Sequence, residues 1–477
     1  MKERYWLQSL LPFFILLLFT PMHVFAQQTP AALEGAWEGN LVLPNGQLRI
    51  VFNLKAEGDG LSATMDSPDQ GATGIPVTST TLEAGILTLN ASAIRGTYKG
   101  TVNEAGDAIA GTWSQGGMSL ELNLSKTEKP TKVDRPQEPQ RPFPYEEEAV
   151  FYDNAVGDAR LAGTLTLPTS PGPHPAVVLI SGSGPQDRDE TIMGHKPFLV
   201  LSDHLTREGI AVLRYDDRGT GESTGNFAAA TSEDLARDAQ AAVDFLKTRS
   251  DIDASQIGLA GHSEGGLIAP MLAQKPDNVA FIVLLAGPGL TGAEILKQQT
   301  NLIAKAAGMS DALVEKLVAT NTTLYAVAQS ASSDTVAEEL KAAVSRIKTE
   351  LGPNTAGALG MGNEAAEQRI VAQLSSPWMR YFLSYDPAPA LTKVKVPVLS
   401  IIGSKDLQVP AAGNTAAIQQ ALQAGNNPHF VAKVLPDLNH LFQTAETGAV
   451  AEYGQITETF APEALDMVGN WIKEQVQ

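Results

Sequence analysis

Residues 257–267 read Ile-Gly-Leu-Ala-Gly-His-Ser-Glu-Gly-Gly-Leu, and they carry the strongest fold signal of the larger part of the chain. The apolar run 257–260 predicts a buried strand, and the residues from Leu267 to Gln274 predict a helix. Ser263 stands on the turn between them, with small neighbours because so tight a turn leaves no room for side chains. The pattern therefore predicts a serine whose Oγ is exposed above a sheet edge, beside a helix N-terminus that favours negative charge.

The sequence around this turn alternates between strands and helices. A Gly-x-Ser-x-Gly pattern alone is weak, because in a chain with 42 Gly among 477 residues chance supplies on the order of 0.2 matches. Strand-like runs occur at 149–152, 161–167, 176–180, 210–215, 257–260, 281–286, 396–402 and 429–435. The first two predict an antiparallel hairpin, and the helical stretches between the others predict a mainly parallel α/β sheet covered on both faces.

One interval, about 290–390, breaks this alternation. It has helical patterns, no strand-like run and a Gly-rich stretch at 352–362. We interpret it as a helical cap inserted between two strands, because such insertions usually cover the site in α/β enzymes. The alternative is a packing appendage that does not contact substrate.

A serine nucleophile needs a base that is oriented by a third group. Only His429 and His440 follow Ser263 in the chain. His429 opens the last predicted strand, whereas His440 lies in the loop after it, so we predict His440 as the base. Asp406, directly after the preceding strand, is the predicted acid; its rival, Asp437, is better placed to shape the loop of His440.

The oxyanion that forms during attack needs preorganised N–H donors. We predict the backbone N–H of Glu264, next to the nucleophile, and that of Ser183, with Gly184 as the alternative. Two charged segments, 186–190 and 216–223, predict an ion-paired loop scaffold, with substrate contact as the alternative reading. No His/Asp/Glu cluster has metal-ligand spacing, so we predict neither a metal nor another cofactor.

The N-terminus has the pattern of a secretory signal peptide. Basic residues Lys2 and Arg4 precede an apolar run at 10–19, and small residues precede a predicted cleavage after Ala26. A membrane anchor is the alternative, but the apolar run is short for a membrane span. We expect residues 1–26 to be removed and the protein to be exported, to a bacterial periplasm or the medium, without a stable anchor.

The remaining chain predicts two domains joined by a linker. Residues 27–125 consist of about eight short strand-like runs, which predict a small all-β barrel or sandwich with Trp37 and Trp113 in its core. Residues 126–144 are rich in Pro and charged residues and predict an extended, solvated linker. The α/β domain then occupies 145–477.

Composition excludes several kinds of protein and partner. Hydrophobic residues make up 43% and charged residues 18% of the chain, which is typical of a globular protein. The net charge of -19 makes nucleic acid and anionic lipid unfavourable partners. Because the chain has no cysteine, disulfides, thiolate nucleophiles, Cys-bound zinc and a lipid-modified N-terminal Cys are excluded.

From residue 145 to the end, the chain resembles the serine hydrolases of the α/β-hydrolase superfamily. The segments 181–189, 215–223, 261–266 and 403–406 are similar to those of exported bacterial carboxylesterases, which are related to dienelactone hydrolases and to prolyl-oligopeptidase-type enzymes. The resemblance implies a triad of Ser263, Asp406 and His440 with an oxyanion hole, in agreement with the assignment made from the residues.

These observations predict a serine carboxylesterase that hydrolyses short- to medium-chain acyl esters, with a small-molecule ester as its partner. One alternative is a serine peptidase that acts on short peptides or aminoacyl amides with the same triad. The other is an envelope binding protein with a degenerate hydrolase fold, in which the β-rich domain is the recognition unit.

Overall fold

The computed structural model describes residues 29–43, 46–58, 60–115, 118–128, 134–154 and 156–476. The predicted signal peptide, 1–26, lies outside these residues. The chain divides into two compact units: one contains residues up to 130 except 41–51 and 66–74, and the other contains those two segments and residues 131 onward. None of the helices in the described ranges is long and apolar enough to cross a membrane.

The β-rich part forms an antiparallel sheet of ten described strands, in the order β4-β3-β2-β1-β10-β8-β7-β6-β5, with β9 paired to β8. The elements are α1 (Pro30–Leu33), β1 (Gly35–Leu43), β2 (Gly46–Glu57), β3 (Gly60–Ser67), β4 (Ala72–Pro76), β5 (Ser79–Glu83), β6 (Ile86–Ala91), β7 (Gly96–Val102), β8 (Ala108–Gln115), β9 (Met118–Glu121) and β10 (Leu124–Thr127). Trp37 and Trp113 are buried, as predicted. The sheet thus has two strands more than the roughly eight that the sequence predicts.

The α/β part is built on an eight-stranded sheet in the order β11-β12-β14-β13-β15-β16-β17-β18. Its strands are β11 (Glu146–Asn154), β12 (Ala159–Leu167), β13 (His174–Ile180), β14 (Ala211–Tyr215), β15 (Ile252–His262), β16 (Ile282–Leu285), β17 (Val398–Gly403) and β18 (Phe430–Leu435). The first two form the predicted antiparallel hairpin, and β12 also pairs antiparallel with β14. All other neighbouring strands of this sheet are parallel. This order is that of the α/β-hydrolase fold.

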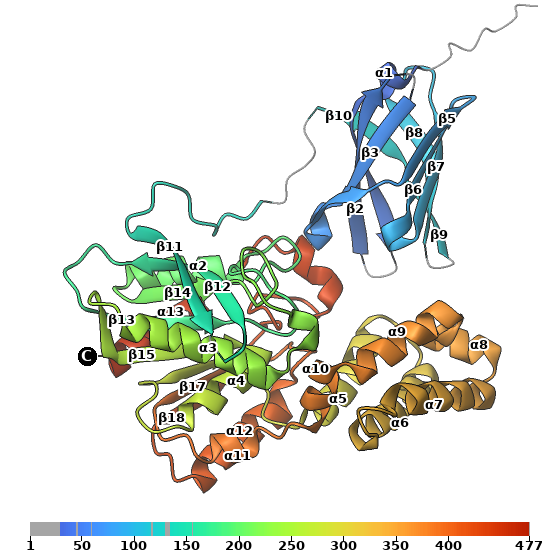
Figure 1. Ribbon diagram of the computed structural model, residues 1–477. Helices are drawn as coiled ribbons and strands as arrows, with labels where there is room; N and C mark the ends of the chain where they lie inside the picture. The colour runs from blue at the N-terminus through green and yellow to red at the C-terminus, as the bar shows by residue number, and fades with distance from the viewer. Residues whose placement is uncertain are drawn as a thin grey trace, which may run out of the picture. The chain divides into compact units, whose positions relative to one another are not determined.

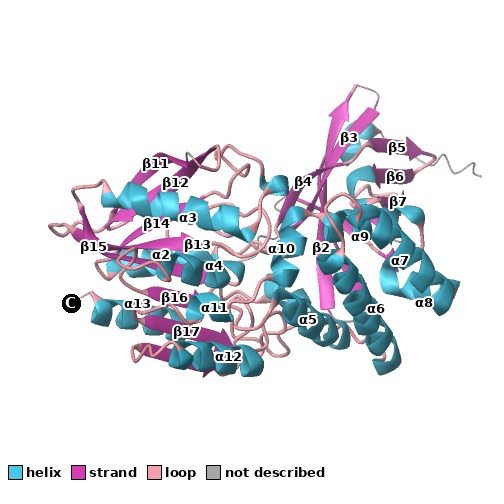
Figure 2. Ribbon diagram, turned by 60° about the horizontal axis from the view of Figure 1, so that its bottom comes forward, coloured by secondary structure: helices cyan, strands magenta, loops and turns pink. Residues whose placement is uncertain are grey.

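Helices cover both faces of this sheet, which explains why its central strands are almost continuously apolar. In β13, Val178 and Ile180 pack into a core with residues of α3, α4, α11 and α12, whereas Val177 and Leu179 pack into another with residues of α2 and α13. The two layers of helices flank the strands in Figure 2. The helices are α2 (Pro197–Arg207), α3 (Ser232–Lys247), α4 (Glu264–Ala273), α11 (Ala388–Leu391), α12 (Ala411–Ala424) and α13 (Pro462–Gln475).

The predicted helical cap lies between β16 and β17, an interval without a strand in the described chain. It consists of α5 (Gly292–Ala306), α6 (Asp311–Ser330), α7 (Val336–Leu351), α8 (Pro353–Ala356), α9 (Glu364–Ser375) and α10 (Pro377–Ser384). Figure 1 shows α5 to α9 gathered beside one another. Side chains such as Leu340, Val344 and Leu383 give the cap a small core of its own.

The segment predicted to be a solvated linker is solvated only in part. Arg135 is half-buried and donates hydrogen bonds to the carbonyl groups of Met193, Gly194, Gly454 and Ile456, at 2.7 to 3.3 Å. A single arginine therefore fastens the residues just before β11 to two loops of the α/β unit. Composition alone could not indicate this, because the acceptors are backbone atoms far away in the sequence.

Candidate active site

Ser263 lies on a strained turn between β15 and α4. Its φ of 51° and ψ of -115° are unusual for a residue with a side chain. A Cβ atom added to Gly261 would lie 2.0 Å from the carbonyl oxygen of Gly265, and one added to Gly265 would lie 2.1 Å from that of Ile180. The glycines of the motif are thus required sterically, and they let the serine turn approach the end of β13.

Asp406 and His440 are brought together by the loops that follow β17 and β18. His440 Nδ1 lies 2.7 Å from Asp406 Oδ2, and both residues are buried. The other oxygen, Oδ1, accepts the backbone N–H groups of Gln408 and Val409, each at 2.8 Å. The carboxylate is therefore fixed by its own loop and turned toward the imidazole.

The two rival residues have other surroundings. Asp437 is exposed and pairs with Lys405 at 3.0 Å, as expected of a residue that shapes its loop. His429 is exposed at the start of β18 and lies outside the cavity that His440 lines. Of these four residues, Asp406 and His440 are the two that the structure brings together.

Ser263 and His440 line one cavity of about 390 Å³. Its walls come from the loop after β13, the serine turn, the loops after β17 and β18, and the cap. The cap contributes Ile295, Leu296, Gln299, Gln373, Trp378, Met379 and Phe382. The insertion therefore lines the cavity that contains the serine.

The predicted oxyanion donors lie at the same cavity. Ser183 and Glu264 both line it, whereas Gly184 does not. The N–H of Gly182 is engaged by Glu190 Oε1 at 2.6 Å. In the described part of the chain the N–H groups of Ser183 and Gly184 have no backbone acceptor, and Ser183 is the one of the two that lines the cavity.

The side chain of Glu264 is a feature that the sequence did not reveal. It is buried, and it accepts hydrogen bonds from Ser232 Oγ at 2.5 Å and from Trp378 Nε1 at 2.8 Å. Burial raises the pKa of this carboxyl group above its usual value. Glu264 therefore joins the serine turn to α3 and to the cap helix α10; only its place beside Ser263 could have indicated a role.

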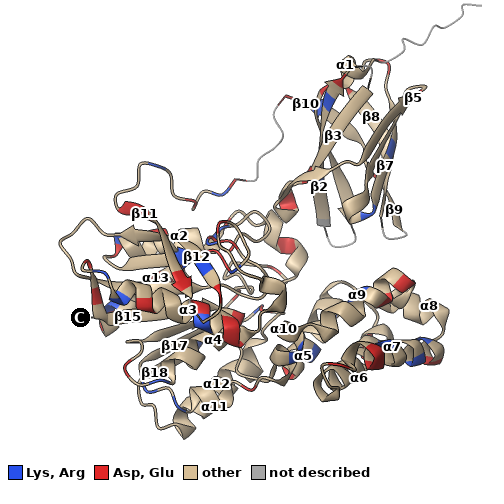
Figure 3. Ribbon diagram, in the orientation of Figure 1, with Lys and Arg blue, Asp and Glu red and all other residues tan. Residues whose placement is uncertain are grey.

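The charged segments after β13 and β14 form the predicted ion-paired scaffold. Arg188 pairs with Asp216 at 2.6 Å, and Asp217 accepts from Ser181 Oγ and from the N–H of Gln186, both at 2.9 Å. Burial raises the pKa of Asp217 to about 8. Acidic and basic residues are interspersed along the elements of this unit (Figure 3), and here they order the loop that carries Ser183.

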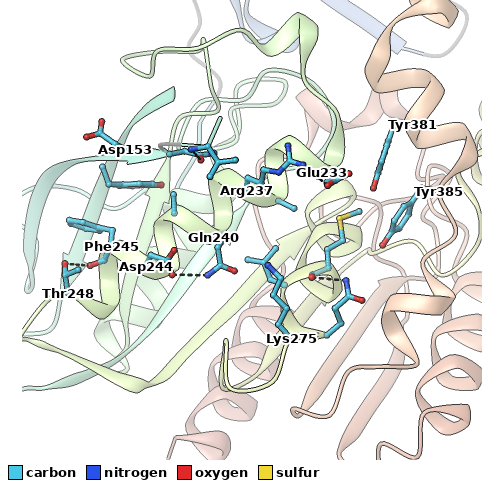
Figure 4. A pocket seen from close by; sticks show the side chains of 18 residues that line it. Asp153, Glu233, Arg237, Gln240, Asp244, Phe245, Thr248, Lys275, Tyr381 and Tyr385 are labelled. Atoms are coloured by element: carbon cyan, nitrogen blue, oxygen red, sulfur yellow. Dashed lines mark hydrogen bonds and ion pairs between the residues drawn. The ribbon is translucent and has the colours of Figure 1, made fainter. Parts of the chain in front are cut away.

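A larger hollow of about 810 Å³ lies elsewhere on the α/β unit. In Figure 4, Tyr381 of α10 and Tyr385, just after its end, stand on one side of it, across from Arg237 and Gln240 of α3. Neither Ser263, Asp406 nor His440 lines this hollow. The smaller cavity is therefore the candidate active site, and α10 lies between the two.

Comparison with known proteins agrees with this fold. Residues 197–372 match the profile of the serine aminopeptidase S33 family; they include Ser263 but end before Asp406 and His440. The chain is 28% identical over 286 residues to esterase EstD of Thermotoga maritima, covering 60% of this chain and 59% of that one. It is also 40% identical over 68 residues to the α/β-hydrolase domain-containing protein WAV2 of Arabidopsis thaliana, which is 14% of this chain and 21% of that one.

The strand order and the serine turn are those of the α/β-hydrolase fold, and these similarities support the same superfamily. Among solved structures, a Pyrococcus furiosus esterase aligns with 73% of this chain and all of its own, at 17% identity and a TM-score of 0.43. A proline iminopeptidase of Mycobacterium smegmatis aligns with 69% of this chain and 98% of its own, at 15% identity and a TM-score of 0.43.

Proposed function

We propose that this protein is a serine carboxylesterase with Ser263 as nucleophile, His440 as general base and Asp406 as the group that orients it. The observation that carries the proposal is the Asp406–His440 hydrogen bond at the cavity that Ser263 also lines. The similarity to an enzyme named an esterase supports the same reaction.

In the proposed reaction, Ser263 Oγ attacks the ester carbonyl carbon while His440 Nε2 takes the hydroxyl proton. The oxygen of the tetrahedral intermediate accepts the N–H groups of Glu264 and Ser183. The C–O bond to the alcohol then breaks, and the alcohol leaves with the proton from His440. Water, deprotonated by His440, attacks the acyl-enzyme and releases the acid and free Ser263. Asp406 stabilises the imidazolium in both halves.

The cavity lining favours an uncharged substrate. Among the residues that the structure describes, no Lys, Arg or Asp lines it. Its two carboxylates are buried: Glu264 accepts from Ser232 and Trp378, and Glu190 is engaged through Oε1, while its Oε2 is buried without a partner. A peptidase that recognises a charged peptide terminus needs an available opposite charge, which these residues do not offer. The apolar wall formed by Leu296, Trp378 and Phe382 fits a short or medium acyl chain.

Turnover of matched acyl esters and aminoacyl amides tests this function. The protein without residues 1–26 should hydrolyse esters of two to eight carbons much faster than amides, and Ser263→Ala should lose this activity without a change in thermal unfolding. Comparable cleavage of amides would identify a peptidase, in line with the S33 profile. Ester turnover retained by Ser263→Ala would exclude the mechanism, and no turnover at all would favour a binding protein.

We also propose that the protein is exported, from the signal-peptide pattern of residues 1–26. Fractionation of the cells that produce it, followed by N-terminal sequencing, tests this. A periplasmic or secreted protein that begins at Gln27 is expected, and an uncleaved chain in the cytoplasm would contradict it.

A further inference from the structure

A second histidine lies beside the proposed triad. His262 is the last residue of β15 and directly precedes Ser263, and only 4% of its surface is exposed. Its ring lies 4.8 Å from the ring of His440. No step of the proposed reaction uses His262, so its burial in the active site needs another explanation.

His262 is hydrogen-bonded through both ring nitrogens. Nδ1 lies 2.9 Å from Oε1 of Glu190, and Nε2 lies 2.9 Å from the carbonyl oxygen of His440. A carbonyl oxygen can only accept, so Nε2 carries a proton. If Glu190 is ionised, Nδ1 also carries one, and the ring is an imidazolium.

Glu190 extends this connection to the oxyanion loop. It is fully buried, its φ of 52° lies in the left-handed region that glutamate rarely adopts, and the same Oε1 accepts the N–H of Gly182. Gly182 directly precedes the proposed donor Ser183. The pair Glu190 and His262 thus contacts the oxyanion loop, the nucleophile turn and the backbone of the catalytic base.

The charges around His262 favour its protonated form. Burial by itself would lower the pKa of His262, but the Glu190 carboxylate, the His440 carbonyl and the charge of Asp406 outweigh it and raise that pKa. The other titratable groups nearby are the His440 ring, Glu264 after the nucleophile and the buried Asp217, which interacts with Glu190.

We propose that Glu190 and the imidazolium of His262 form a positioning pair, which holds the His440 backbone and the Ser183 loop in one arrangement around Ser263. This inference rests on the proposed function. When His262 loses one proton, its ring keeps a single N–H for two acceptors, Glu190 Oε1 and the His440 carbonyl oxygen. One of the two hydrogen bonds is then lost. The pair touches no reacting atom and acts through the groups that do.

Glu190→Gln tests the pair through its pH dependence. Glutamine keeps the size and an oxygen acceptor for the Gly182 N–H but removes the negative charge, so His262 should lose its second proton at lower pH. We expect the alkaline limb of kcat to move at least one pH unit toward acid, which is about a tenfold loss on that limb, with KM little changed. A profile parallel to that of the wild type would overturn the proposal.

Asp238→Asn is the matched control. Asp238 is also buried, pairs with Arg218 at 2.6 Å and with Asn154 at 2.7 Å, and lies outside the cavity. Its replacement should lower kcat by the same factor at every pH, or lower the stability of the protein, without shifting the alkaline limb. A shift equal to that of Glu190→Gln would show a general effect of buried charge and would overturn the proposal.

Nitrogen NMR of the ¹⁵N-histidine-labelled wild-type protein supplies a readout independent of turnover and of the folding of any variant at position 190. At pH 7.5 His262, assigned with His262→Gln, should show protons on both ring nitrogens. A neutral ring with the proton on Glu190 would overturn the proposal even in an active esterase. Failure of the function itself would appear separately, as ester turnover that survives Ser263→Ala.

Discussion

Individual side chains at this site are held by contacts from several loops. Asp406 has one oxygen for its own loop and one for His440, so its charge and its orientation are both fixed. A carboxylate held in this way keeps the imidazole in the tautomer whose Nε2 can accept a proton.

Asp406→Asn should lower kcat about 10³- to 10⁴-fold with KM little changed, because an amide N–H facing His440 favours the wrong tautomer. Steady-state kinetics on a short acyl ester measure this. Asp437→Asn is the control, since Asp437 pairs with Lys405 on the surface, and it should keep nearly full activity. A similar loss in both variants would contradict the assignment of Asp406.

Among the elements, the contact between α4 and the cap helix α10 depends on one hydrogen-bond donor. Trp378 of α10 donates its indole N–H to both oxygens of Glu264, at 2.8 and 3.0 Å. A buried carboxylate that loses a donor pays a desolvation cost. The cap is therefore connected to the nucleophile turn by a buried hydrogen bond as well as by packing.

Trp378→Phe should lower the free energy of unfolding by about 1–3 kcal/mol, because it leaves Glu264 with fewer donors. Tyr381→Phe, on the same helix but lining the larger hollow, should change it by less than about 0.5 kcal/mol. Chemical denaturation of both variants measures the difference. Equal effects would show that the indole N–H contributes nothing specific.

The serine turn gives a second prediction at the scale of elements. Gly265→Ala places a Cβ 2.1 Å from the Ile180 oxygen, so β13 and the oxyanion loop must shift, at a cost of about 1–3 kcal/mol. In Gly357→Ala, the control in the cap, the nearest atom is 4.0 Å away, and stability should stay almost constant. Thermal unfolding compares them, and a harmless Gly265→Ala would contradict the described turn.

At the scale of the whole molecule, stability should depend on pH through a buried histidine. His195 is fully buried and lies 2.9 Å from Thr459 Oγ1 and 2.7 Å from the Tyr453 oxygen. Burial, with a smaller effect of Arg135, lowers the pKa of His195 to about 4. The folded state thus binds fewer protons than the unfolded state between pH 6.5 and 4, and stability falls as pH falls through this window.

This linkage amounts to at most about 3 kcal/mol between pH 6.5 and 4. Denaturation of the wild type and of His195→Gln at a series of pH values measures it, because carboxylate titrations are common to both proteins. The unfolding free energy of the wild type should fall more steeply toward acid than that of the variant. Parallel curves would show that His195 does not titrate on unfolding.

The sequence predicted what is encoded locally. The strands, the serine turn and the cap follow from apolar periodicity and glycine placement, and the chain order of Ser263, Asp406 and His440 follows from where each loop lies relative to its strand. The pairing of Glu190 with His262 and the anchoring of Arg135 could not be predicted, because they join residues 58 to 321 positions apart. Such contacts exist only once the sheet has brought its loop ends together.

The most direct test of the central claim is mass spectrometry of the enzyme quenched in acid during turnover of an activated short-chain ester. The wild type should carry an acyl group on the peptide that contains Ser263, and Ser263→Ala should lack it. Turnover without this adduct, or an acyl group on another residue in both proteins, would contradict it.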